Sequence, residues 1–170
     1  TLVGMNCVNN TAVNQNLVLN LMAYIDYEGE QPQFKIPEDS NIQWHNATDY
    51  ISNEPVRKSP QYNLVYDGWK RNEMRTSQSL SGFVLGKGFG RDKGDKVSYE
   101  INILPGKEKG MIGFRYNTPK GKTSTFQVKG ITESRLELQG TGEYNIVSIP
   151  YTCKEPGKYT LKLISEGTHS

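Results

Sequence analysis

The 170-residue sequence has few of the residues on which catalysis and metal binding most often depend. It contains two histidines, His45 and His169, and two cysteines, Cys7 and Cys153. Distant cysteines without a Cys-x-x-Cys pair do not make a zinc site, and two histidines this far apart are not a His-x-x-x-His pair. A Gly-x-Ser-x-Gly nucleophile motif is also missing. The sequence therefore predicts a chain that is not itself an enzyme.

Long apolar runs and an excess of charge of one sign are absent as well. No stretch approaches the roughly 20 apolar residues that a membrane-spanning helix needs. The 20 basic and 18 acidic residues are mixed along the chain and leave a net charge of +2. No signature of a nucleic-acid-binding domain accompanies them. We therefore expect no membrane span and no nucleic-acid partner.

The cysteines leave two interpretations open. A bond between Cys7 and Cys153 would close a loop of roughly 150 residues, which the chain-entropy model values at about 5 kcal/mol. Two buried free thiols are the alternative. The chain begins at Thr1 rather than Met, which predicts a processed or excised piece of a longer protein.

What the sequence does contain is alternation of apolar and polar residues. Between Val97 and Ile103 every second residue is apolar, which is typical of a strand with one dry face and one wet face. Gly or Pro separates such runs about every ten residues, as in sandwiches and jelly rolls. Strands are expected at 62–66, 79–85, 96–104, 111–117, 123–129, 134–139, 144–149 and 158–164. The fold class predicted is all-β, an antiparallel jelly-roll-like β-sandwich of the galactose-binding-domain type.

The N-terminal third is less regular. Alternation over 16–27 favours a strand over a helix, and another short strand is expected within 2–8. Residues 28–62 contain four prolines and show no clear element. We therefore divide the chain into residues 1–61, N-terminal strands plus a Pro-rich connecting segment, and residues 62–170, the sandwich. One continuous domain is the alternative.

The loops between the expected strands carry no cofactor motif. Residues 104–107 and 154–158 contain Pro-Gly turns, and residues 117–122 are interpreted as a hairpin loop. The glycine-rich run 86–90 lacks the spacing of a phosphate-binding loop and is followed by a strand. Asp92 and Asp95 could meet a calcium ion, but Lys93 between them favours a solvated charged turn. No cofactor is predicted, with calcium kept as the alternative.

The densest group of recognition residues lies between Tyr66 and Arg75. Sugars are bound by flat rings that stack on their C–H faces and by Asp, Asn and Arg side chains that hydrogen-bond their hydroxyls. The other interpretation is that Trp69 closes one end of the sandwich, covered by Arg71 or Arg75 paired with Glu73. Trp44, among polar neighbours, has the same two interpretations. The predicted ligand-binding residues are Trp44, Tyr66, Asp67, Trp69, Arg71 and Arg75.

The stretches 67–71 and 90–101 resemble the C-terminal accessory β-sandwich of secreted bacterial glycoside hydrolases of the β-L-arabinofuranosidase-like type. A charged, Gly-rich turn leads into a Ser-Tyr-x-Ile strand, and strands similar to 113–116 and 126–128 follow. The ending, 156–163, is similar to the closing strands of carbohydrate-binding modules, in which a turn such as 165–167 precedes one further strand.

The resemblance implies a non-catalytic carbohydrate-binding or accessory module that is secreted, periplasmic or at the cell surface. Its partners would be a polysaccharide or oligosaccharide and a catalytic domain of the same polypeptide. A purely structural domain that packs against a glycoside hydrolase is the alternative. The family's catalytic residues lie in another domain, so no catalytic residue is carried over.

Overall fold

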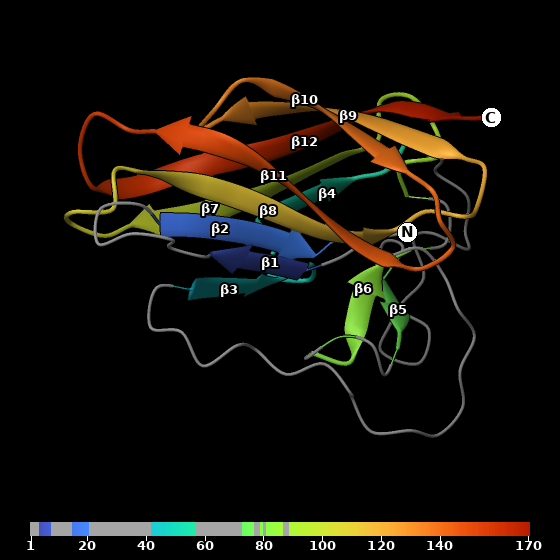
Figure 1. The fold of residues 1–170 in the computed structure, drawn as a ribbon, viewed down its shortest axis with the longest axis horizontal. Coiled ribbons are helices and arrows are strands. Elements are labelled where there is room, and N and C mark those ends of the chain that lie inside the picture. The colour runs from blue at the N-terminus through green and yellow to red at the C-terminus, as the bar shows by residue number, and fades with distance from the viewer. Residues whose placement is uncertain are drawn as a thin grey trace.

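The computed structural model describes residues 4–7, 15–20, 42–56, 73–76, 79, 81–86 and 89–170. These residues form twelve strands and no helix, so this part of the chain is all-β. The strands are β1 (Gly4–Cys7), β2 (Gln15–Asn20), β3 (Ile42–Asn46), β4 (Ser52–Glu54), β5 (Glu73–Arg75), β6 (Phe83–Leu85), β7 (Lys96–Ile103), β8 (Lys109–Asn117), β9 (Thr123–Gly130), β10 (Ser134–Gln139), β11 (Tyr144–Thr152) and β12 (Gly157–His169) (Figure 1).

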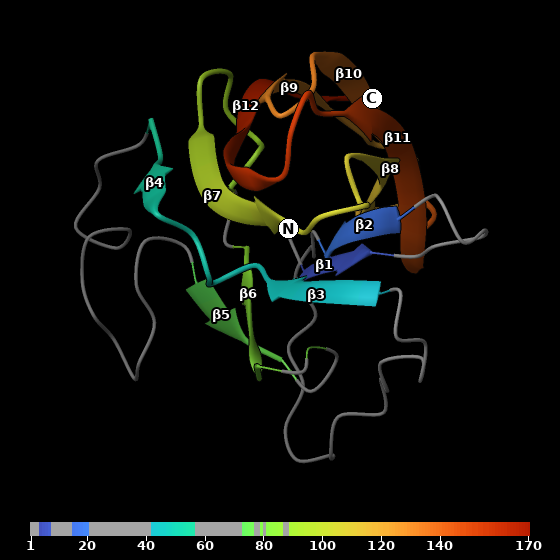
Figure 2. The same ribbon diagram turned by 90° about the vertical axis from the view of Figure 1, so that its left-hand side faces the viewer.

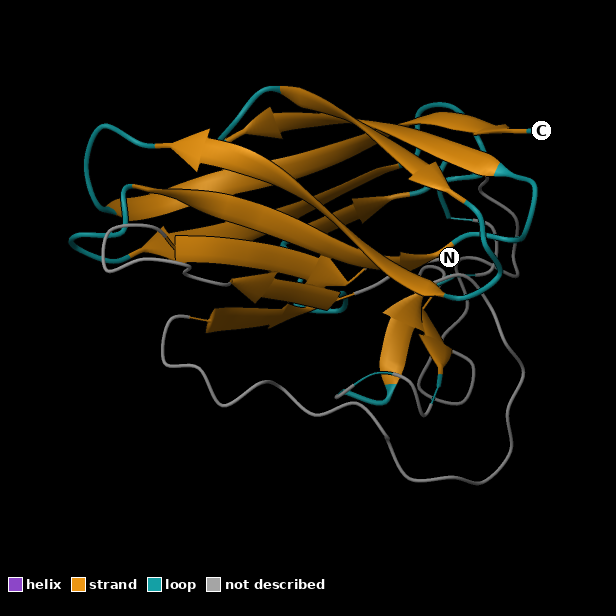
Figure 3. Ribbon diagram, viewed as in Figure 1, coloured by secondary structure: helices purple, strands orange, loops and turns teal. Residues whose placement is uncertain are grey.

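The strands form two five-stranded sheets and one small ribbon (Figure 3). The first sheet has the order β1-β3-β2-β8-β11 and the second the order β10-β9-β12-β7-β4, while β5 pairs with β6. All pairings of the second sheet are antiparallel. In the first sheet β2 is parallel to both β3 and β8. All other pairings of the first sheet are antiparallel.

One hydrophobic core is built from both five-stranded sheets. Phe114 of β8 belongs to the same cluster of buried side chains as Tyr99 of β7 and Phe126 of β9. Figure 2 shows β7, β9, β10 and β12 on one side of the molecule and β1, β2 and β3 on the other. Leu85 and Phe89 join the cluster from β6 and the segment after it. Burial of these side chains removes apolar surface from water, which is the main stabilising contribution to such a fold.

The strand predictions for the second half of the chain are confirmed to within a few residues at most ends. In β7, Val97, Tyr99, Ile101 and Ile103 are buried, whereas Glu100 and Asn102 are exposed. The bounds of β10 are those predicted. The prediction for 79–85 was too long, because only Phe83–Leu85 is a strand, and the prediction for 62–66 lies outside the described residues.

Three local predictions are corrected by the structure. Residues 117–122 do not close a hairpin, because β8 belongs to the first sheet and β9 to the second. Residues 28–62 contain two short strands, β3 and β4, in spite of their prolines. Residues 165–167 are not a turn before another strand, since β12 continues through them to His169 with a β-bulge.

Two glycines mark places where the backbone needs a positive φ. Gly106, with a φ of 79°, follows Pro105 in the predicted Pro-Gly turn, and the N–H of Lys107 donates to the carbonyl of Leu104 at 3.0 Å. Gly130, with a φ of 102°, ends β9 against β12, where an added Cβ would lie 2.0 Å from the carbonyl oxygen of Thr160. Both positions favour glycine because other residues are strained at these angles.

Cys153 carries a free thiol and is buried at the edge of the core. Burial raises the pKa of this thiol, while a hydrogen bond with Tyr159 lowers it. Cys7 lies on β1, whose side chains are outside the description. The interpretation with a free thiol at Cys153 is therefore the one that the structure supports.

Candidate binding site

The six predicted ligand-binding residues are described to different extents. Tyr66, Asp67, Trp69 and Arg71 lie outside the described residues. Arg75 is the last residue of β5, where it pairs with Phe83 of β6, and its side chain is not described. Trp44 lies on β3, and its side chain is among those described. The predicted convergence of these six side chains therefore stays a prediction.

Trp44 is half-buried and is held by a local hydrogen-bond network at the end of β3. Its indole Nε1 donates to Asn46 Oδ1 at 3.2 Å. The backbone N–H and the side-chain Nδ2 of Asn46 both donate to Asp49 Oδ2, at 2.9 and 3.0 Å. Because its polar atom is bound within the turn, the indole ring is oriented by the protein before any ligand arrives.

The turn after Trp44 is anchored to two other elements. The Tyr99 hydroxyl, fully buried on β7, donates to the carbonyl of Ala47 at 2.8 Å, and burial raises the pKa of this phenol well above its usual range. The Tyr50 hydroxyl donates to Glu73 Oε1 at the start of β5. The structure thus brings the β3–β4 turn next to the strand that ends in Arg75.

A second surface, which we call the outer face, is the side of the second sheet that points away from the core. Because side chains alternate along a strand, every second residue of β7, β9, β10 and β12 lies on this side. Most of these residues are polar or charged. The outer face consists of Lys96, Ser98, Glu100 and Asn102 on β7, Thr125, Gln127 and Lys129 on β9, Arg135, Glu137 and Gln139 on β10, and Lys158, Thr160, Lys162, Ile164 and Glu166 on β12.

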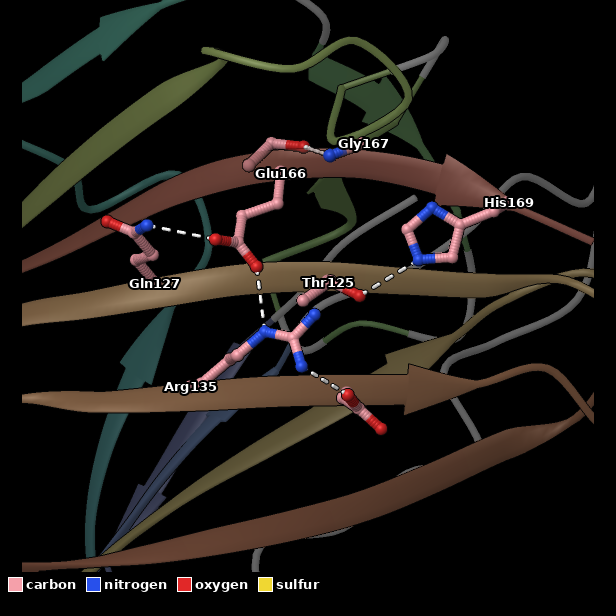
Figure 4. A network of polar contacts seen from close by, with 8 residues as sticks. Thr125, Gln127, Arg135, Glu166, Gly167 and His169 are labelled. Atoms are coloured by element: carbon pink, nitrogen blue, oxygen red, sulfur yellow. Dashed lines mark hydrogen bonds and ion pairs between the residues drawn. The ribbon is translucent and has the colours of Figure 1, made fainter.

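An ordered polar network occupies the outer face between β9, β10 and β12 (Figure 4). Arg135 donates from Nε to Glu166 Oε2 at 2.8 Å and from Nη1 to Glu137 Oε1 at 2.6 Å. Gln127 Nε2 donates to the other oxygen of Glu166 at 2.9 Å. The hydrogen bond from Arg135, followed by that from Gln127, lowers the pKa of Glu166. Four side chains from three strands are therefore held in one arrangement on an open surface.

The β-bulge in β12 is what directs Glu166 toward this network. Ser165 pairs with Phe126 and Gly167 with Thr125, so Glu166 is the extra residue between two successive partners. Ser165 Oγ donates to the carbonyl of Gly90 at 2.9 Å and accepts the N–H of Gly167 at 3.0 Å. Bulges often redirect a side chain next to a functional site. Sequence reasoning missed this residue, although Ser-Glu-Gly inside a strand run was the available signal.

Thr125 and His169 continue the polar surface toward the C-terminal end of β12. Thr125 Oγ1, which is buried, and Nε2 of the exposed His169 lie 3.3 Å apart. Together with the network, His169 places an imidazole beside the guanidinium, carboxylate and amide groups of adjacent strands (Figure 4). Such a surface can form several hydrogen bonds at once with a ligand that carries both donors and acceptors.

In the Asp92–Asp95 turn, the carboxylate of Asp95 accepts hydrogen bonds from backbone N–H groups of the protein. Asp95 is buried and accepts the N–H of Gly90 at 2.9 Å and that of Val56 at 2.8 Å. Burial raises the pKa of Asp95, against the effect of these hydrogen bonds. No three His, Cys, Asp or Glu side chains within the described ranges are placed to hold a metal ion. The calcium alternative remains a prediction.

Comparison of the chain with known protein families, with curated proteins and with solved structures found no match in any of the three. Among the residues that the structure describes, no helix is long and apolar enough to cross a membrane. The function is therefore inferred from the surfaces described above.

Proposed function

We propose that this protein is a non-catalytic carbohydrate-binding or accessory module of a secreted bacterial polysaccharide-degrading system, built as a jelly-roll-like β-sandwich. The observation that carries the proposal is the ordered polar network of Arg135, Glu137, Gln127 and Glu166 on the outer face. The shared core of the two sheets supports the sandwich. Its place of action would be outside the cell, in the periplasm or at the cell surface.

The chemistry of the network suits the hydroxyl groups of a sugar. Each hydroxyl donates one hydrogen bond and accepts others, so neighbouring hydroxyls match a carboxylate next to a guanidinium or an amide. Because these side chains already hold one another in place, a ligand would lose less of its binding free energy to ordering them. A dissociation constant between micromolar and millimolar corresponds to about 8 to 4 kcal/mol, which a few contacts can supply.

The aromatic part of the site is proposed from the sequence. Trp44, Tyr66 and Trp69 would stack on sugar rings, with hydrogen bonds from Asp67, Arg71 and Arg75. The fixed orientation of the Trp44 indole through Asn46 supports this role, because a ring that is already oriented can stack at a lower entropic cost.

One observation favours the alternative function, a structural domain that packs against a catalytic domain. Ile51 and Val56 flank the edge strand β4 and are 61% and 52% exposed. Exposed apolar side chains beside an edge strand are a common feature of surfaces that meet another domain. In this alternative the outer face would bind no sugar.

The proposal is tested by isothermal titration calorimetry of the protein with a panel of neutral and acidic polysaccharides, together with Arg135→Ala. We expect saturable heat for at least one polysaccharide and about tenfold weaker binding of Arg135→Ala, because its guanidinium orients both carboxylates. Lys154→Ala, an exposed residue on the β11–β12 connection, is the matched control and should bind as the unaltered protein does.

Intrinsic tryptophan fluorescence in the same titrations tests the aromatic part. A ligand-induced change that is lost in folded Trp44→Ala or Trp69→Ala would locate a stacking platform. Absence of binding across the whole panel would overturn the carbohydrate proposal and leave the structural domain.

A further inference from the structure

One row of the outer face places two lysines directly opposite each other. Lys162 of β12 pairs with Lys129 of β9 on one side and with Ser98 of β7 on the other. Ser52 of β4 continues the row beside Ser98. Residues paired in this way have Cβ atoms about 5 Å apart, so their side chains meet on the sheet surface.

The two lysines do not form an ion pair with a carboxylate among the described residues, and carboxylates in the neighbouring rows have other partners. Glu100 binds Lys158 at 2.7 Å, and Glu54 lies 3.9 Å from Lys96. Glu133, the residue that follows the row beyond Lys129, accepts the N–H of Gly130 at 3.3 Å. Like charges directly opposite each other on a sheet are destabilising. A bound anion would remove that repulsion.

Ser98 adds an independent observation. It lies between Val97 and Tyr99, both of which point into the core, so its side chain points to the outer face. The residue is 3% exposed, and its Oγ has no hydrogen-bond partner among the described residues. A buried hydroxyl without a partner is costly, and such groups normally have one. The hydroxyl therefore has an unused donor on the side of the sheet that carries Lys162 and Lys129.

We propose that Lys129, Lys162 and Ser98 form a subsite for an oxyanion, a sulfate or a carboxylate, carried by a glycan that lies across the outer face. Each ammonium group donates charge-assisted hydrogen bonds to an oxyanion, and the serine hydroxyl donates one more. The subsite is one row away from the Arg135 network, since Gln127 and Lys129 are next to each other on the same side of β9. This inference rests on the proposed function and narrows it to acidic glycans.

The test compares polysaccharides that differ in charge but not in backbone. Dextran sulfate is titrated beside dextran, and polygalacturonate beside its methyl ester, each with the intact protein at several salt concentrations. We expect the charged member of at least one pair to bind about tenfold more tightly at low salt, a preference that weakens as salt is added. The two pairs separate a sulfate from a carboxylate.

Substitutions in the row assign the preference to these residues. Lys129→Gln with Lys162→Gln should remove most of the preference for the charged polymer, whereas Lys120→Gln with Lys154→Gln, two exposed lysines on loops, should keep it. Ser98→Ala should weaken binding of the charged polymer about threefold without lowering the unfolding temperature, because it removes a hydroxyl that has no partner.

Each remaining outcome overturns a different statement. Equal binding of charged and neutral polymers, or retention of the preference in the double lysine variant, would overturn the subsite and leave the proposed function standing. No binding of any polymer would overturn both. Duplex DNA that binds as tightly as dextran sulfate would overturn the assignment to a glycan.

Discussion

The outer side of β8 and the outer face of the second sheet show opposite uses of the same strand pattern. On β7, β10 and β12 the outward residues are mostly polar and reach solvent. On β8, the outward residues Arg115 and Asn117 are buried. The guanidinium of Arg115 lies over the ring of Tyr144 at 4.3 Å from its centre, and Tyr144 is hydrogen-bonded to Thr76, just after β5.

This difference indicates which surface is available for a ligand. Arg115 is buried and Tyr144 is partly buried, and this burial lowers the pKa of Arg115 and raises that of Tyr144 to about 12. Polar residues on β8 therefore stabilise contacts within the chain, whereas most outward residues of β10 and β12 are at least partly accessible. Polar character alone does not define a binding surface; accessibility together with order does.

The largest expected effect concerns the edge of the second sheet, where Asp95 joins the segment after β4 to the loop before β7. Asp95→Ala would leave the buried N–H group of Gly90 and the part-buried N–H group of Val56 without their acceptor. Each such loss costs about 1–3 kcal/mol, so we expect the free energy of unfolding to fall by about 2–4 kcal/mol. Denaturant unfolding followed by circular dichroism measures this.

Asp95→Asn is the matched control, since it keeps one acceptor oxygen and should cost less. The pH dependence gives a second check. Because the pKa of Asp95 is raised in the folded state, its contribution is largest below about pH 4 and declines as pH rises through the raised value. This decline should be missing in Asp95→Asn. An unaltered stability of Asp95→Ala would show that the loop is not anchored by this carboxylate.

The second prediction tests whether the covered side of β8 is held by the stacked pair. A double-mutant cycle with Arg115→Met and Tyr144→Leu should give a coupling of about 1 kcal/mol, because a cation over an aromatic ring gains strength when it is removed from water. The measurement is the free energy of unfolding of the four proteins. Arg135→Ala, on the outer face, should leave stability nearly unchanged, since Arg135 and Glu137 are exposed and Glu166 is only partly buried.

If Arg135→Ala destabilised the protein as much as Arg115→Met does, the contrast between the two surfaces would be wrong. If Arg115 and Tyr144 did not couple, burial alone, without the stacking of Arg115 on Tyr144, would explain the stability of the outer side of β8. Either result would change which polar residues are regarded as free to meet a ligand.

Local pattern predicted the strands of the second half because each one alternates over enough residues to define its two faces. The alternation of β7 and the bounds of β10 follow directly from it. The local pattern does not indicate to which sheet each strand belongs. The chain moves between sheets at 104–107 and at 117–122, and both loops are compatible with a hairpin.

The candidate site was harder to predict for the same reason. Gln127, Arg135 and Glu166 meet only because β9 pairs with both β10 and β12 in one particular register. A shift of one residue in either pairing would place one of these side chains on the core side. Nothing within a single strand specifies that register. The aromatic cluster was predictable as a composition, but its geometry depends on the same long-range placement.

The smallest expected effect concerns His45 on β3, in the first sheet beside the turn that orients Trp44. Its Nε2 is buried without a hydrogen-bond partner among the described residues, and burial lowers its pKa, with Asp49 opposing the shift. The unfolded chain therefore takes up a proton before the folded protein does. The stability that depends on neutral His45 is complete above about pH 6.5 and is lost as pH falls through the lowered folded value.

We expect the free energy of unfolding to fall by less than about 1 kcal/mol between pH 7.5 and pH 5.5, and this dependence to be weaker in His45→Gln. Parallel denaturant titrations of the two proteins measure the difference, which cancels the contributions of the carboxyl groups that they share. Identical pH profiles would mean that His45 reaches water in the folded protein. The turn that holds Trp44 would then be as open as the outer face, and the contrast between the two sheets would apply to β8 alone.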